Sequence, residues 1–141
     1  MSHADGRPRI VLVEDNPADV YLIEMALSHE KIDYELRCFE TGEEAVSALV
    51  NQASSEEPDI ILLDLNTPRG DGIETLKAIQ QTPRYADVPT AIITSSRSES
   101  DQHRVSLLGT ARYIHKPTNL DEFLANIGRA VKEMLLQRRA T

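Results

Sequence analysis

Five short apolar runs alternate with five amphipathic stretches along the 141-residue chain. Such an alternation of strand and helix signals predicts a parallel β-sheet with helices on both of its faces. The runs at 10–13, 60–63 and 91–93 are apolar throughout, as in central strands buried on two sides. We therefore expect a doubly wound, five-stranded α/β fold. The predicted strands are 9–14, 33–38, 59–64, 89–94 and 111–115, and the predicted helices are 17–29, 42–52, 72–82, 99–108 and 119–138.

Local signals sharpen these boundaries. Asn16 followed by Pro17 is typical of a helix N-cap and first helical position, and Asn119 with Glu122 resembles a capping box. In segment 33–38 apolar and charged residues alternate, which predicts an edge strand that contains Cys38 as a small apolar residue. The segments 54–58 and 80–87 are interpreted as connections. The last helix has a 3.6-residue apolar stripe of Leu120, Phe123, Leu124, Ile127, Val131, Met134 and Leu135.

Composition restricts the class of protein. A chain of this length predicts one domain, which we place at 9–138 between a lead at 1–8 and a tail at 139–141. The net charge of −8 argues against a nucleic-acid or anionic-membrane partner, because both require a basic patch. The single cysteine excludes an internal disulfide and favours a cytoplasmic location. The chain has neither a signal-peptide region nor an apolar run of about 18 residues that could span a membrane.

Acidic side chains follow two of the predicted central strands. Glu14 and Asp15 come at the end of the first strand, and Asp64 ends the third. Open α/β sheets place their ligands at the carboxyl ends of the strands, so these three carboxylates are expected to meet. Carboxylate oxygens suit Mg²⁺, which typically uses one or two of them and takes the rest of its ligands from water and phosphate.

A hydroxyl group and a lysine follow the two later strands. Thr94 ends the fourth predicted strand, and Lys116 follows the fifth. A cation, a hydroxyl and a lysine around a carboxylate are the groups that stabilise a transferring phosphoryl group, and an aspartate can itself be the nucleophile. Each residue alone has an ordinary structural explanation as a turn, strand or surface residue. The ordered set, with each member at the end of a different strand, indicates a functional site whose groups could stabilise a transferring phosphoryl group.

At these residues the chain resembles the receiver domains of two-component response regulators. The resemblance covers about residues 8–138 and rests on VEDN at 13–16, ILLDLNTPRGDG at 61–72, AIITSS at 91–96 and YIHKP at 113–117. It implies the flavodoxin-like strand order 2-1-3-4-5. It also implies a phosphoacceptor signalling protein that catalyses only its own phosphorylation and dephosphorylation.

The resemblance assigns a role to each site residue. Asp64 accepts a phosphoryl group from a sensor histidine kinase, and Glu14 and Asp15 hold Mg²⁺ together with Asp64 and the backbone carbonyl of Asn66. Lys116 contacts the acyl phosphate. The remaining implied roles concern the switch and its lifetime: Thr94 and Tyr113 move on phosphorylation, and Asn66 and Ser96 tune autodephosphorylation.

Three other functions can be weighed against this one. A haloacid-dehalogenase-type phosphatase needs a second aspartate, but Asn66 stands at that position, so the general acid is missing. A flavodoxin-like FMN site needs a phosphate cradle, whereas the first loop is acidic. A receiver-like scaffold that works without phosphorylation stays open. His115 next to Lys116 is interpreted as an edge-strand residue in preference to a pH sensor.

The resemblance also suggests partners. The segment EDNPADVYLIEMAL at 14–27 and the long connection at 80–89 are similar to single-domain regulators paired with bacterial phytochrome kinases. Because no output domain follows, we expect a freestanding regulator that signals by binding a downstream protein. A homodimer through the 99–138 face is a further expectation, since the last helix stays apolar near its end.

Overall fold

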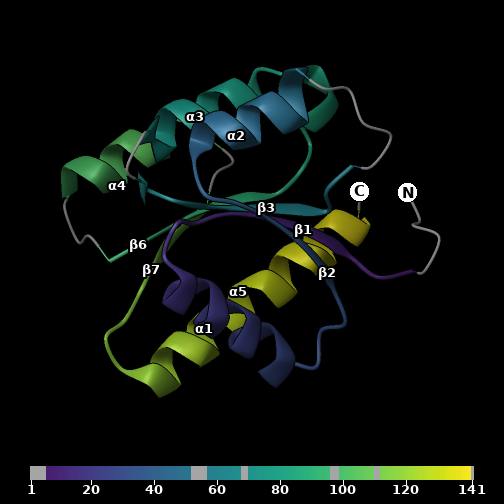
Figure 1. Ribbon diagram of the computed structural model, residues 1–141, viewed down its shortest axis with the longest axis vertical. Helices are drawn as coiled ribbons and strands as arrows, with labels where there is room; N and C mark the ends of the chain where they lie inside the picture. The colour runs from purple at the N-terminus through teal and green to yellow at the C-terminus, as the bar shows by residue number, and fades with distance from the viewer. Residues whose placement is uncertain (1–5, 52–56, 68–69, 96–98, 110–111, 141) are drawn as a thin grey trace.

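The computed structural model describes residues 6–51, 57–67, 70–95, 99–109 and 112–140, and shows a five-stranded parallel sheet between two layers of helices (Figure 1). The strand order is β2-β1-β3-β6-β7, which confirms the predicted order 2-1-3-4-5. The strands are β1 (Arg9–Val13), β2 (Glu35–Phe39), β3 (Ile60–Asp64), β6 (Thr90–Thr94) and β7 (Arg112–His115).

The apolar runs form the three central strands, as their composition predicts. All side chains of β3 before Asp64 are fully buried, and β6 is buried along its whole length. Register is set by the parallel ladders, in which Val13 lies beside Leu63 and Asp64 beside Ile93. The carboxyl ends of β1, β3 and β6 are therefore level with one another at one edge of the sheet. Successive strands are added on one side of β1 and then, from β3 onward, on its other side. Such folds place their ligands at this switch point between β1 and β3.

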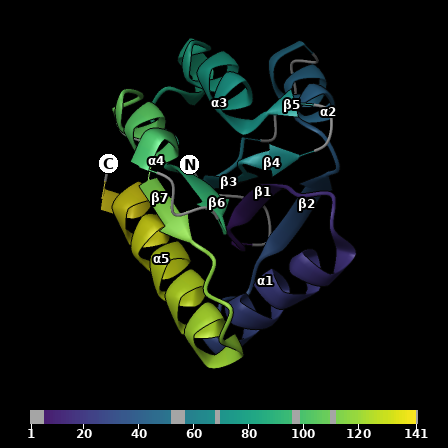
Figure 2. The ribbon, with the colours of Figure 1, turned by 90° about the vertical axis from the view of Figure 1, so that its left-hand side faces the viewer.

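The helices lie in two layers, one on each face of the sheet (Figure 1). On the first face α1 (Pro17–His29) and α5 (Leu120–Ala140) lie side by side, as Figure 2 also shows. On the second face lie α2 (Gly42–Val46), α3 (Gly72–Gln80) and α4 (Glu99–Ser106). Alternate residues of each strand point to opposite faces, so Ile10 and Leu12 pack under α1 and α5, whereas Val11 and Val13 pack under the other layer.

The predicted helix caps are present in part. The Asn16 side chain accepts hydrogen bonds from the backbone N–H groups of Ala18 and Asp19, at 2.9 and 3.4 Å. The Asn119 side chain likewise accepts the N–H of Glu122 at 3.0 Å, which is half of the predicted capping box. These bonds satisfy amide groups that have no partner within the helix, and so they determine where α1 and α5 begin.

The structure differs from the predicted elements in several local details. The predicted helix 42–52 is an α-helix only to Val46 and continues as a π-helix (Ser47–Asn51), and β2 begins and ends later than predicted. The connection after α3 contains a 3₁₀ helix (Pro83–Tyr85), whose Tyr85 is fully buried and donates its hydroxyl to the Leu49 carbonyl at 2.6 Å. The turn after Asp64 forms a small hairpin of β4 (Asn66–Thr67) and β5 (Gly70–Asp71).

Two apolar residues are more exposed than the sequence indicated. Leu120, the first residue of the predicted apolar stripe on α5, is 49% exposed because it lies at the open first turn of the helix. Cys38 lies in a strand as predicted, but the residue is exposed, since β2 is at the edge of the sheet. Within the described ranges, no helix combines the length and the low charge needed to cross a bilayer.

Candidate functional site

Three carboxylates meet where β1 and β3 end. Each of Glu14, Asp15 and Asp64 offers an oxygen within 4.8 Å of the oxygens offered by the other two. Glu14 is buried, and the side chain of Asp64 is 12% exposed. The Asn16 N–H donates to Glu14 Oε2 at 3.3 Å, so the start of α1 helps to orient this carboxylate. The convergence predicted from the two strand ends is therefore present.

Lys116 lies among these acids. Its Nζ donates to Glu14 Oε1 at 2.8 Å and lies 3.7 Å from Asp64 Oδ2, while only 10% of its side chain is exposed. Its own backbone N–H donates to the Thr94 carbonyl at 2.7 Å, which anchors the segment after β7 to the end of β6. The lysine thus reaches across the sheet edge from β7 to β1 and β3.

A third carboxylate contacts this lysine, and it was not predicted. Asp19, in the first turn of α1, accepts a hydrogen bond from Lys116 Nζ at 2.9 Å. Helical side chains tilt toward the N-terminus of their helix, which directs Asp19 back to the strand ends. Because Asp19 follows Asn16 by three residues, the sequence offers an ordinary explanation for it as a helix-start acid. Its partner Lys116 lies 97 positions further along the chain, so no local sequence pattern predicts their contact.

The charges of the site are interdependent. Burial raises the pKa of Glu14 to about 7; the hydrogen bond from Lys116 opposes this rise, and the nearby Asp64 adds to it. Burial alone would lower the pKa of Lys116, but its hydrogen bonds to Glu14 and Asp19 outweigh burial and raise that pKa. The lysine is therefore held as a cation, and Glu14 is poised to exchange a proton near neutral pH.

The other predicted residues lie around the same edge. Thr94 is fully buried at the end of β6, beside His115 at the end of β7. Tyr113 is half-buried and packs against the core under the α2–α3–α4 layer. His115 ends an edge strand, as interpreted from the sequence, and its Nε2 lies 3.2 Å from the Ser95 carbonyl. Ser96 and the side chain of Asn66 lie outside the described residues.

Gly72 keeps the loop after β3 close to the site. A Cβ atom at Gly72 would lie 2.8 Å from the carbonyl oxygen of Asp64 and 2.9 Å from Cα of Leu65. These are backbone atoms that cannot move aside, so only glycine permits this close approach. The Gly72 N–H also donates to the Leu65 carbonyl at 3.2 Å. The start of α3 is thereby packed directly on the strand that ends in Asp64.

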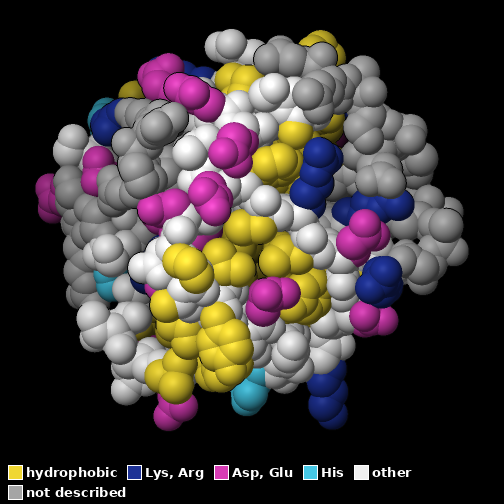
Figure 3. Space-filling view, in the orientation of Figure 1, with side chains coloured by type: hydrophobic (Ala, Val, Ile, Leu, Met, Phe, Trp, Pro, Cys, Tyr) yellow, Lys and Arg dark blue, Asp and Glu magenta, His cyan; other side chains and the backbone are white. Residues whose placement is uncertain are grey.

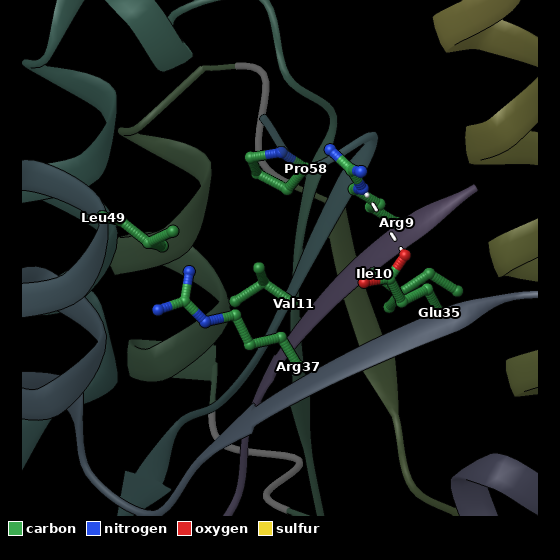
Figure 4. A pocket seen from close by; sticks show the side chains of 7 residues that line it. All are labelled: Arg9, Ile10, Val11, Glu35, Arg37, Leu49 and Pro58. Atoms are coloured by element: carbon green, nitrogen blue, oxygen red, sulfur yellow. Dashed lines mark ion pairs between the residues drawn. The ribbon is translucent and has the colours of Figure 1, made fainter. Parts of the chain in front are cut away.

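Two hollows of the surface lie away from these acids. One, of about 30 Å³, is at the opposite end of β1 and β2 and is lined by Arg9, Glu35 and Arg37 among others (Figure 4). Its Arg9 Nε is 3.5 Å from Glu35 Oε2, and its volume suits a water molecule better than a ligand. The other, of about 360 Å³, lies between the segment before β1 and the end of α5.

The face of the molecule drawn in Figure 3 carries many acidic side chains, in agreement with the net negative charge. Figure 3 shows hydrophobic side chains gathered in the lower centre, near the position of α1 in Figure 1, with acidic side chains around them. The described Lys and Arg side chains on this face form a few separate groups.

The sequence matches the response regulator receiver domain family over residues 10–128. The chain therefore belongs to this family, whose members are signalling domains that operate within two-component systems. This match confirms the resemblance inferred from the strand-end motifs.

The chain is similar to phytochrome response regulators in particular. It is 36% identical over 126 residues to the response regulator Rcp1 of Synechocystis sp. (strain PCC 6803), with 86% of each chain covered. The structure of the phosphorylated cyanobacterial phytochrome response regulator RcpA is 33% identical, with a TM-score of 0.83 and coverage of 92% of this chain and 94% of that one. The Mn²⁺-bound form of Rcp1 is 34% identical, with a TM-score of 0.82 and coverage of 91% and 94%.

Larger regulators match as well. The transcriptional regulatory protein TrcR of Mycobacterium tuberculosis is 34% identical over 125 residues, which are 88% of this chain and 46% of that protein. The chain thus spans about half the length of this relative.

Proposed function

We propose that Asp64 accepts a phosphoryl group from the phosphohistidine of a sensor kinase. The observation that supports this most strongly is the convergence of Glu14, Asp15, Asp64 and Lys116 at one edge of the sheet. In the transfer, a carboxylate oxygen of Asp64 forms a bond to phosphorus while the bond between phosphorus and the imidazole nitrogen breaks. The electron pair of that bond stays on the nitrogen, and the product on Asp64 is an acyl phosphate.

The three carboxylates are suited to holding Mg²⁺. They supply only oxygen ligands, and their oxygens lie close enough together to share one small cation. We propose Glu14, Asp15 and Asp64 as ligands, with the backbone carbonyl of Asn66 as a further one. Bound there, Mg²⁺ would offset the negative charge of the phosphoryl oxygens. The similar protein Rcp1 has a Mn²⁺-bound form, and this divalent ion in a relative supports the assignment.

The remaining site residues act on the phosphoryl group or respond to it. Lys116 donates hydrogen bonds to a phosphoryl oxygen, since its Nζ already lies 3.7 Å from the Asp64 carboxylate. Phosphorylation adds about −1.5 to −2 charges beside existing acids, so the structure relaxes by moving the buried Thr94 toward the new oxygens. Tyr113 then rotates inward, and the population of α4 and β7 conformations shifts. Asn66 and Ser96 are proposed to tune hydrolysis of the acyl phosphate.

We further propose that the kinase is a bacterial phytochrome and that the signal passes to a partner protein. The similarity to the phytochrome response regulator RcpA supports the first part. The exposed Leu107, Leu120 and Leu136, at 71, 49 and 58%, support a homodimer through the 99–138 face. Light scattering with and without a phosphoryl mimic tests the dimer, and a monomer in both states would exclude it.

Phosphorylation is tested by intact mass after incubation with Mg²⁺ and acetyl phosphate. Wild type is expected to gain the mass of one phosphoryl group, and Asp64→Asn to gain none. Asp59→Asn is the matched control, because Asp59 lies just before β3, at its other end, and accepts the backbone N–H of Arg9 at 2.7 Å. It should behave as wild type. A wild-type protein that stays unmodified, or an Asp64→Asn variant that is still phosphorylated, would overturn the assignment.

A further inference from the structure

Lys116 contacts three carboxylates. Glu14 and Asp64 have roles in the proposed phosphorylation, but the third, Asp19, has none. Lys116 Nζ donates to Glu14 at 2.8 Å and to Asp19 at 2.9 Å, and it lies 3.7 Å from Asp64. An ammonium has three N–H donors, and two of them are used in the bonds to Glu14 and Asp19. The lysine is therefore bound more closely to α1 than to the proposed phosphoacceptor.

Asp19 differs from the other acids in position and in exposure. It is absent from the trio whose oxygens converge for a cation, and it projects from the first turn of α1. Its side chain is 29% exposed, against 1% for Glu14 and 12% for Asp64. A carboxylate at this place in a helix also interacts favourably with the helix dipole. That structural role explains an acid in the first turn, but it does not require the hydrogen bond to Lys116.

Phosphorylation changes what Lys116 can bind. A phosphoryl group on Asp64 brings about −1.5 to −2 charges and three acceptor oxygens. These are added to a carboxylate that already lies 3.7 Å from the lysine Nζ. The ammonium must then share its N–H groups between the new oxygens and Asp19. Phosphorylation therefore weakens the interaction between Asp19 and Lys116. The interaction energy that is lost opposes phosphorylation and favours the unphosphorylated state.

We propose that Asp19 is a positioning residue that restrains Lys116 in the unphosphorylated state and so limits how readily Asp64 takes and keeps a phosphoryl group. This inference rests on the proposed role of Asp64 and extends it to a residue on α1. Asp19 acts through the lysine and does not touch the phosphoryl group. The direction of the effect is defined. Removing the charge of Asp19 should speed the phosphorylation of Asp64, whereas removing a residue that assists Lys116 would slow it.

The test compares variants of Asp19 that keep or remove the interaction with the lysine. Asp19→Asn removes the charge with little change in size, Asp19→Ser removes it with a shorter side chain, and Asp19→Glu retains it. Glu43→Gln is the net-charge control, since Glu43 is an exposed acid in the first turn of α2. Two quantities are measured with saturating Mg²⁺: the rate of phosphorylation by acetyl phosphate, from intact mass, and the Kd for beryllofluoride, from fluorine NMR. Thermal unfolding is followed in parallel.

We expect Asp19→Asn and Asp19→Ser to be phosphorylated about fivefold faster and to bind beryllofluoride about fivefold more tightly, the size typical of one partly exposed ion pair. Asp19→Glu and Glu43→Gln should stay near wild type. Equal rates in all variants, slower phosphorylation of Asp19→Asn, or the same increase in Glu43→Gln would overturn the inference while Asp64 remains the phosphoacceptor. If wild type takes up no phosphate, the proposed function fails together with this extension of it.

Discussion

The two helical layers differ in regularity. On one face of the sheet, α1 has 13 residues and α5 has 21, and the two helices pack against each other along the sheet. On the other face, α2 has 5 residues before a π-helix of 5, and α3 and α4 have 9 and 8. Long, mutually packed helices resist local movement, whereas short and interrupted helices can shift separately. The difference suggests a rigid α1–α5 layer and an adaptable α2–α3–α4 layer.

The site lies between these layers and has contacts to both. Asp19 of α1 holds the lysine from the side of the rigid layer, while Thr94 precedes the segment that leads to α4. A charge added at Asp64 is therefore expected to leave α1 in place and to displace α4. This contrast between the layers can be tested by substitutions whose expected effects range from large to small.

The largest effect is expected from removing buried isoleucines. Ile127 of α5 and Ile79 of α3 are both fully buried, so Ile127→Ala and Ile79→Ala are a matched pair. Such truncations typically reduce the free energy of unfolding by about 2 to 5 kcal/mol, and the cost is higher where the surroundings cannot close around the cavity. We expect the upper part of that range for Ile127→Ala and the lower part for Ile79→Ala, because α3 ends one residue later, at Gln80.

Urea denaturation followed by circular dichroism measures both values, with wild type at the same protein concentration as the reference. An equal or larger loss for Ile79→Ala would show that the α2–α3–α4 layer is at least as rigid as the α1–α5 layer, and the contrast would then have to be abandoned.

The sequence predicted the sheet and α1 better than the α2 region. Apolar runs identified the sheet, because burial on both faces leaves little choice of residue, and Asn16 with Pro17 marked the start of α1 at the correct residue. The α2 region was predicted as one regular helix, yet it turns into a π-helix at Ser47. Its geometry follows from packing, such as the bond from Tyr85 to the Leu49 carbonyl, which joins residues 36 positions apart.

The same distinction applies to the site. Glu14, Asp15, Asp64, Thr94 and Lys116 could be predicted because strand order alone brings strand ends together. Asp19 could not, because its helical position has a sufficient local explanation and its partner lies 97 residues away. Leu120 belongs to the predicted apolar stripe of α5 but is exposed, for a related reason: helical periodicity indicates which face a residue occupies, but not whether the neighbouring layer extends far enough to cover it.

A second prediction concerns pH and the ionisation of Glu14. Its pKa in the folded, metal-free protein is raised from 4.5 to about 7, so folding favours the protonated carboxyl. The stability associated with this group is complete below pH 4.5 and is lost as pH rises through about 7. Wild type without metal should therefore lose stability between these values relative to Glu14→Gln, whose side chain cannot ionise.

The affinity for Mg²⁺ should increase as pH rises, because Mg²⁺ binds the ionised carboxylate of Glu14. We expect its Kd to weaken by up to about tenfold for each pH unit below 7, the limit for release of one proton. Calorimetry in two buffers of different ionisation enthalpy measures that proton release directly. A Kd that is independent of pH between 5 and 7 would show that Glu14 is already ionised in the metal-free protein.

The smallest effect is expected at Thr94, where stability and signalling should separate. Thr94 is fully buried at the end of β6. Thr94→Val keeps the shape of the side chain and removes the hydroxyl, and Thr94→Ser keeps the hydroxyl and removes the methyl group. Loss of one hydroxyl hydrogen bond changes the free energy of unfolding by only about 1 kcal/mol. Both variants should therefore fold and should accept a phosphoryl group on Asp64.

They should differ in what phosphorylation does to the adaptable layer. In wild type and Thr94→Ser, beryllofluoride should change the amide hydrogen exchange of α4, which contacts β7, and leave that of α1 unchanged. In Thr94→Val the change in α4 should be lost, because no hydroxyl remains to follow the new oxygens. If α4 still responds in Thr94→Val, the signal must leave the site by another route, and the segment after Asp64, packed on the strand by Gly72, is then the nearest alternative. If α1 responds as strongly as α4, the two layers are not functionally distinct, whatever their difference in helix length.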